Sequence, residues 1–253
     1  MTAARGALVL CADIDETGLN ETVDEIVASG GSAEACHADV TRLEDMQNAV
    51  SRAVDLWGRL DVLVNNAGTM PLAFYADHRE AGPAWDKCID VNIKGVLHGI
   101  MAAYDQMIAQ RRGQVINLSS IYGNHPVVGA GVYGATKAAV DFLSASLRTE
   151  AQGMIKVTNV KPTGVPGTNL ASGVVNPEAV VGILGQNAAS YGAVMEAHAA
   201  GQLPANQTDH TNIEYVLLEP QYLAEQILYV IDQPWGVNIS DLTVRASGDA
   251  WIL

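Results

Sequence analysis

Basic residues, cysteines and long apolar runs are scarce in this chain of 253 residues. Its 14 lysines and arginines stand against 28 aspartates and glutamates, so the net charge is −14. Such a charge argues against nucleic acid or an anionic membrane surface as a partner. No apolar segment approaches the roughly 18 residues of a membrane-spanning helix, and the first residues do not resemble a secretory signal. We therefore expect a cytoplasmic protein that binds neither nucleic acid nor membranes.

The cysteines are three in number and lie far apart, at Cys11, Cys36 and Cys88. An odd count without paired spacing favours neither a disulfide framework nor a zinc site, so we expect small apolar side chains at these positions and no bound metal. A Pro/Ser-rich or charged linker is also missing. We therefore expect a single domain over residues 1–253.

Short apolar runs rich in β-branched residues alternate with segments of helical periodicity. This alternation predicts an α/β fold, a doubly wound parallel sheet in a Rossmann-like three-layer arrangement. The expected strands cover residues 7–12, 33–38, 60–64, 114–118, 156–160 and 242–245, and the main expected helices cover residues 16–28, 41–56, 85–110, 133–149 and 220–231.

The strand expected at residues 114–118 leads directly into Ser119 and Ser120. Ligands of open α/β sheets bind at this carboxyl edge. Further along, Tyr133 and Lys137 have the i,i+4 spacing that puts both side chains on one side of a helix. A free tyrosine has a pKa near 10, and a lysine that lowered it by about 2–3 would stabilise the phenolate by roughly 3–4 kcal/mol. The pattern predicts Tyr133 as a proton-transfer group, with Ser120 holding a substrate oxygen.

Together, Ser120, Tyr133-x-x-x-Lys137, the segment Asn65-Asn66-Ala67-Gly68 and Asn92 resemble the classical short-chain dehydrogenase/reductase family. The resemblance implies an NAD(P)-dependent alcohol dehydrogenase or ketone reductase with Tyr133 as general base and acid. It also implies that Lys137 lowers the phenol pKa and holds the nicotinamide ribose, and that Asn92 binds a water of a proton relay. Read without the family, Asn92 is a core amide satisfied by a nearby backbone carbonyl.

The resemblance also implies a cofactor site. Asp13, just past a strand, would bind the adenosine ribose and favour NAD over NADP, whereas Asp15 is better explained as a helix N-cap. Asp39 and Val40 would contact the adenine, and Asp39 also suits an N-cap. The remaining implied cofactor residues are Asn66, Ala67, Gly68, Tyr133, Lys137, Val165 and Thr168.

The family's first strand, glycine-rich turn and first helix have no counterpart before Ala7. Three explanations stay open: a start internal to a longer product, a truncated variant that holds the dinucleotide poorly, or a cofactor-free relative with an anion site. The alternative function, in another class, is a catalytically silent binding or oligomerisation partner that cannot hold the dinucleotide.

An insertion at about residues 170–219 is expected to be the substrate lid. Its few charges and many apolar residues suggest a hydrophobic secondary alcohol or ketone as substrate. The helices expected at residues 85–110 and 133–149 resemble the family's four-helix interface, which implies a homodimer or homotetramer.

Overall fold

Parallel strands form the centre of this computed structural model, which describes residues 1–251. In one sheet, β1 (Leu8–Asp13) pairs with β2 (Ser32–His37). In the other, the order is β3 (Val62–Asn65), β4 (Gly113–Leu118), β5 (Ile155–Pro162) and β6 (Asp241–Val244). Every described pair is parallel. The predicted α/β class with a parallel sheet and flanking helices is confirmed.

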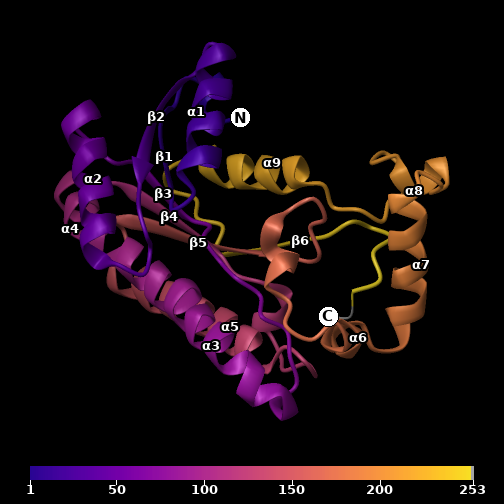
Figure 1. The fold of residues 1–253 in the computed structure, drawn as a ribbon. Helices are drawn as coiled ribbons and strands as arrows, with labels where there is room; N and C mark the ends of the chain where they lie inside the picture. The colour runs from indigo at the N-terminus through magenta and orange to yellow at the C-terminus, as the bar shows by residue number, and fades with distance from the viewer. Residues whose placement is uncertain (252–253) are drawn as a thin grey trace.

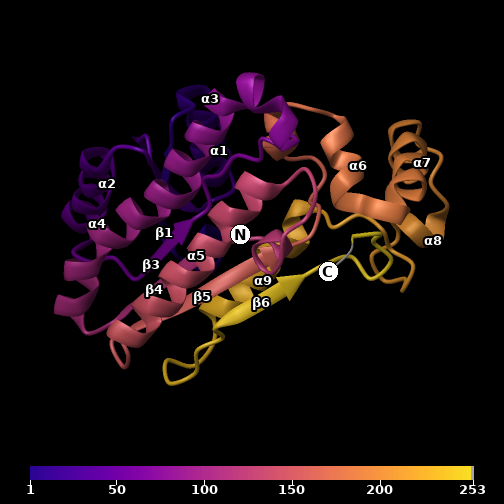
Figure 2. The same cartoon turned by 90° about the horizontal axis from the view of Figure 1, so that it is seen from below.

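Some helices flank the strands, and others form a separate group beside them (Figure 1, Figure 2). Those near the sheets are α1 (Glu16–Ala28), α2 (Leu43–Trp57), α3 (His78–Ile89), α4 (Gly95–Gln110), α5 (Gly131–Glu150) and α9 (Pro220–Ile231). The expected insertion contains α6 (Glu178–Leu184), α7 (Ala188–Ala199) and α8 (Ala205–Thr208), which we call the helical lobe. Among residues 1–251, no helix has the length and apolar character needed to cross a membrane.

Strand β4 explains the layering, because all six of its residues are buried. Successive side chains of a strand point to opposite faces. Val115 accordingly packs with α4 and α5, whereas Ile116 packs with Val230 of α9 on the other face. A strand that is covered on both faces has a nearly continuous apolar sequence, and this apolar run is what predicted β4.

The described strands form two sheets rather than the single sheet expected from the sequence. Within residues 1–251, β1 pairs only with β2, and β3 pairs only with β4 on its one bonded side. Leu8 of β1 and Val64 of β3 are 52% and 40% exposed. The absence of a glycine-rich unit stays a prediction, since this pairing concerns the described residues alone.

The single helix predicted over residues 85–110 is wrong in two respects. The helical region begins earlier, at His78, and a π-helical turn at Asp90–Lys94 separates α3 from α4. A π turn holds one more residue than an α turn and is frequent at functional sites. Asn92 lies in this turn.

Candidate functional site

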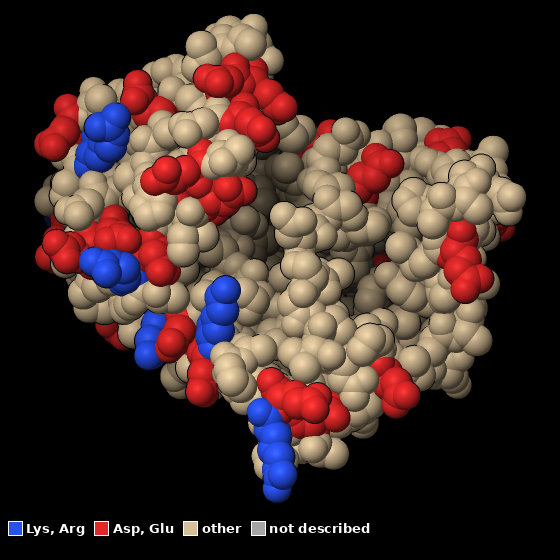
Figure 3. Space-filling model, in the orientation of Figure 1, with Lys and Arg blue, Asp and Glu red and all other residues tan. Residues whose placement is uncertain are grey.

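A cavity of about 1390 Å³ runs along the carboxyl ends of the strands and under the helical lobe. Asp13, the last residue of β1, borders it, as do Gly68 after β3, Ser120 after β4 and Val165 after β5. Figure 3 shows the hollow between the helical lobe and the rest of the molecule, and most of the acidic and basic side chains in this view lie outside the lobe. Parallel strands bring these sequence-distant residues to one edge, as the sequence predicted.

Tyr133, Lys137 and Ser120 meet in the cavity, each no more than 5% exposed. Helix α5 carries the first two, one turn apart, and Ser120 lies two residues past the end of β4. The Lys137 Nζ donates to the Leu118 carbonyl at 2.7 Å and lies 5.9 Å from the centroid of the Tyr133 ring. Ser120 Oγ accepts from the Tyr122 backbone N–H at 3.2 Å. Its own proton is therefore free to point elsewhere.

The pKa values differ from the expectation that Lys137 lowers the pKa of the phenol. Burial raises the pKa of Tyr133 to about 12, although a hydrogen bond with Ser120 acts in the opposite direction. Burial also lowers the pKa of Lys137 to about 8. The physical reason is that desolvation disfavours the charged form of both groups. Tyr133 therefore keeps its proton near neutral pH.

Asn92 is fully buried and bonded on both sides of its amide. Its Oδ1 accepts from the Thr69 backbone N–H at 2.9 Å, and its Nδ2 lies 3.0 Å from the Thr69 carbonyl and 3.0 Å from Thr136 Oγ1. Cys88 Sγ is a further acceptor at 3.2 Å. Asn92 thus ties the π turn to the loop after β3, in line with the interpretation as a satisfied core amide, and its role in a water relay stays a prediction.

The last residue of β3 links two strands, whereas the segment that follows it lines the cavity. Asn65 Nδ2 donates to Asn117 Oδ1 at 2.8 Å, which links β3 to β4. Gly68 instead faces the cavity, where an added Cβ would lie 3.6 Å from the Lys137 Nζ and 3.4 Å from the Asn92 Oδ1. A glycine at this position leaves the lysine open to a bound molecule. Asn66 and Ala67 also line the cavity.

The acidic residues near β1 and β2, at one end of the cavity, differ in their hydrogen-bond partners. Asp15 caps α1 by accepting from the Thr17 N–H at 3.1 Å, as expected. Asp39 does not cap α2, whose N-cap is Arg42, because its carboxylate accepts from the backbone and hydroxyl of Thr41 instead. Asp13, exposed, lines the cavity together with Asp39 and Val40.

Comparison with known proteins agrees with this geometry. The short chain dehydrogenase family matches residues 1–179, which is more than half of the chain. The chain belongs to this family.

Two curated relatives of this short-chain dehydrogenase are named as oxidoreductases, without a substrate. An uncharacterized oxidoreductase of Listeria innocua is 31% identical over 99% of this chain and 91% of its own length. An uncharacterized oxidoreductase of Staphylococcus aureus is 31% identical over 95% of this chain and 87% of its own length. These matches and the family support an oxidoreductase.

Solved structures share the fold across nearly the whole of the chain. A 3-ketoacyl-ACP reductase from Sinorhizobium meliloti has a TM-score of 0.77 and 27% identity, covering 99% of this chain and 91% of its own. A serine dehydrogenase complexed with NADP+ has a TM-score of 0.74 and 28% identity, covering 96% and 86%. A 7α-hydroxysteroid dehydrogenase complexed with NADH, at 23% identity and TM-score 0.74, covers 98% and 87% and shows the fold alone. Nicotinamide cofactors thus occur among the neighbours.

The residues of this dehydrogenase fit a nicotinamide dinucleotide. One cavity reaches from the acidic end at Asp13 past Gly68 to Tyr133 and Lys137. The side-chain-free position at Gly68 leaves room beside Lys137, whose three N–H donors suit ribose hydroxyls. Val165 and Thr168 border the same cavity, and the Thr168 hydroxyl donates to the Val165 carbonyl at 3.1 Å.

Residues 121–129 were expected to shape one wall of the substrate site, but sequence reasoning missed the aromatic residues that join Tyr122 there, Tyr191 and Trp251. Tyr122, Tyr191 and Trp251 all line the cavity, although they come from three distant segments. No spacing rule links them, and the lid expected at about residues 170–219 holds only two aromatic residues, Tyr191 and Tyr215, so composition gave no signal either. Of the cysteines, Cys88 is buried and the other two are partly exposed, and no group of residues suited to a metal ion occurs in the described part of the chain.

Proposed function

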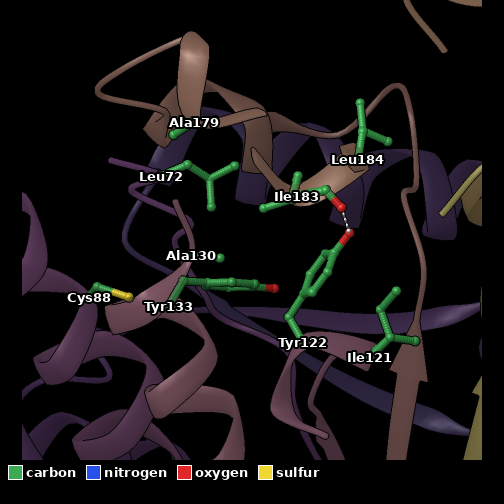
Figure 4. Packing of buried hydrophobic residues seen from close by; sticks show 9 residues of the cluster. All are labelled: Leu72, Cys88, Ile121, Tyr122, Ala130, Tyr133, Ala179, Ile183 and Leu184. Carbon is green, nitrogen blue, oxygen red and sulfur yellow. Dashed lines mark hydrogen bonds between the residues drawn. The ribbon is translucent and has the colours of Figure 1, made fainter. Parts of the chain in front are cut away.

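We propose that this short-chain dehydrogenase/reductase interconverts a hydrophobic ketone and its secondary alcohol, with Tyr133 as the acid and base of the reaction. The observation that carries the proposal is the meeting of Tyr133, Ser120 and Lys137 in one cavity whose other wall is apolar. Leu72, Ile183 and further apolar residues pack around the Tyr133 ring (Figure 4).

A bound nicotinamide supplies or accepts the hydride in such a reaction. Ser120 binds the substrate oxygen, and Tyr133 donates its proton to that oxygen as the ketone is reduced. A phenol with a pKa of about 12 holds this proton at neutral pH. This protonation state suits ketone reduction, whereas alcohol oxidation requires a lower phenol pKa. Lys137 holds the ribose, and Asn92 supports the proton relay.

NAD is the cofactor we propose. The acidic end of the cavity carries Asp13 and Asp39, and among the described lining residues the only cations are Lys87 and Lys137. The 2′-phosphate of NADP would bring further negative charge towards carboxylates, whereas the ribose hydroxyls of NAD can donate to them.

The substrate is proposed to be hydrophobic because of the lid side of the cavity. Its lining residues there are uncharged and mostly apolar, as in Leu170, Val174, Val180, Ile183 and Met195. A charged substrate would lose its hydration without a partner on this wall.

The test is Tyr133→Phe, assayed for NADH-dependent reduction of a panel of apolar ketones. Loss of the proton donor is expected to lower kcat by about 10²–10⁴-fold. Tyr229→Phe is the matched control, because Tyr229 is 53% exposed on α9 and lies outside the cavity lining. Calorimetric titration with NADH accompanies the assay. An active Tyr133→Phe enzyme contradicts the mechanism, and a wild type that binds no cofactor favours the silent-partner function.

A further inference from the structure

Three aromatic rings from separate parts of the chain converge on the lid side of the cavity. The Trp251 ring lies 5.0 Å from that of Tyr191 at an interplanar angle of 60°, and 6.1 Å from that of Tyr122 at 73°. Both are edge-to-face geometries, which favour aromatic pairs. Tyr191 belongs to α7, Tyr122 follows β4, and Trp251 lies in the segment after β6.

Trp251 is packed closely against the loop that follows β5. A Cβ at Gly164 would overlap the Trp251 indole, so only a glycine admits the ring at this position. The neighbouring Val165 lines the cavity. The indole therefore lies beside the loop implied in nicotinamide binding rather than on a remote surface.

A buried carboxylate holds the segment that carries this tryptophan. The Asp249 side chain is 3% exposed, and its Oδ2 accepts from Thr163 Oγ1 at 2.8 Å. Its Oδ1 accepts from the Arg245 guanidinium and from the Trp251 backbone N–H at 3.3 Å. A buried charge is stable only when paired and hydrogen-bonded in this way.

Further contacts tie the same segment to the helical lobe and to the core. The Asn187 side chain donates to the Ala250 carbonyl at 2.8 Å, and the Gly248 N–H donates to the Tyr215 carbonyl at 2.8 Å. Arg245 also donates to the Trp251 carbonyl at 3.1 Å. The segment from Ala246 to Trp251, which we call the tail, thus joins the lobe to the loop after β5.

The tail shares its cavity with the reacting residues. Tyr122 packs in one buried cluster with Tyr133 and donates its hydroxyl to the Ile183 carbonyl at 3.2 Å (Figure 4). Trp251 packs against that cluster. The aromatic rings therefore border the apolar space into which the body of a substrate would extend from the Tyr133 hydroxyl.

We propose that Trp251 is a specificity-determining residue: with Tyr191 and Tyr122 it forms an aromatic wall that selects ketones bearing an aromatic or alicyclic ring, and Asp249 positions it through Thr163. This inference rests on the proposed function and names its substrate class. A planar or compact ring can contact an aromatic face over most of its area, whereas a linear chain cannot.

The test compares 1-tetralone with 2-octanone as ring and linear ketones. The kcat/KM ratio of 1-tetralone to 2-octanone is expected to fall by about tenfold in Trp251→Leu, from the loss of an aromatic pair. Trp251→Phe keeps a ring and restores most of the ratio. Trp235→Leu is the control, because Trp235 lies outside the cavity lining. An unchanged ratio in Trp251→Leu overturns the proposal.

The positioning role of Asp249 has a separate readout. Thr163→Val removes the hydroxyl that donates to this carboxylate, and Thr163→Ser keeps it. We expect the ring-to-linear ratio to fall in Thr163→Val and to remain near the wild-type value in Thr163→Ser. Equal ratios in the two variants contradict the positioning role.

A binding measurement separates failure of this inference from failure of the proposed function. Quenching of tryptophan fluorescence by 1-tetralone needs no turnover. If the wild type reduces neither ketone, the proposed function fails, but quenching that is lost in Trp251→Leu and kept in Trp235→Leu still supports the wall. Quenching that is equal in the two variants refutes it.

Discussion

Replacing the buried Lys137 tests the electrostatics of the site most directly. In the folded protein its pKa falls from 10.5 to about 8 because burial disfavours the ammonium. At roughly 1.4 kcal/mol for each pKa unit, this opposes folding by about 3 kcal/mol at neutral pH. A lysine with a lowered pKa destabilises the fold below that pKa. The penalty fades as pH rises from about 8 towards 10.5, where the unfolded chain also loses its proton.

The assay is urea unfolding of the wild type and of Lys137→Met at several values from about pH 7 to about pH 9.5. The variant lacks the titrating group, so the free energy of unfolding of the wild type relative to the variant should rise by about 2 kcal/mol over this range. Titrations common to both proteins cancel in the difference. The raised pKa of Tyr133 does not interfere, because its effect on stability begins only above pH 10.

Lys94→Met is the control, since the Lys94 side chain is 56% exposed. Its unfolding free energy relative to the wild type should stay nearly constant with pH. A flat difference for Lys137→Met as well would refute the reasoning, because it would mean that the Lys137 ammonium keeps its hydration in the folded protein.

Three further predictions follow from other parts of the molecule. Gly99→Ala should lower the free energy of unfolding by about 1–3 kcal/mol in urea titrations, because an added Cβ would overlap the Asn65 side-chain oxygen; an unchanged stability would contradict this packing. We propose that α4 and α5 form the interface of a homodimer or homotetramer. Phe142 lies on α5 and is 78% exposed, so Phe142→Asp should give a smaller species by light scattering, whereas Ile213→Asp should not. Asp13→Asn should raise the kcat/KM for NADPH relative to NADH by about tenfold, since one carboxylate no longer opposes the 2′-phosphate; an unchanged ratio would argue against a role for Asp13 in cofactor choice.

Local signals in the sequence were sufficient for several elements. The bounds of α1 and α9 coincide with those predicted, because apolar periodicity marks each helix and Asp15 and Pro220 stand at their first turns. Strand β4 begins one residue before its predicted start and ends at Leu118 as predicted, because its apolar run leads directly into the two serines. The i,i+4 spacing likewise required Tyr133 and Lys137 to share one side of a helix.

Local sequence signals could not predict the π turn at Asn92, because the side chain there bonds to residues far away in the chain. Asn92 bonds Thr69 and Thr136, which lie 23 and 44 residues away in the chain. Helical periodicity records which face is apolar and not where an extra residue enters a turn. The predicted continuous helix was therefore wrong at that point.

What the sequence determined by itself was the family, the parallel α/β fold and the residues at the strand ends, since each follows from short patterns along the chain. The tertiary structure alone decided the protonation of the site and the aromatic wall. Spacing placed Lys137 near Tyr133, but burial governs both pKa values and reverses the expected direction for Tyr133. Asp249 meets Thr163 across 86 residues of sequence, and only the folding of the tail onto the loop after β5 joins them.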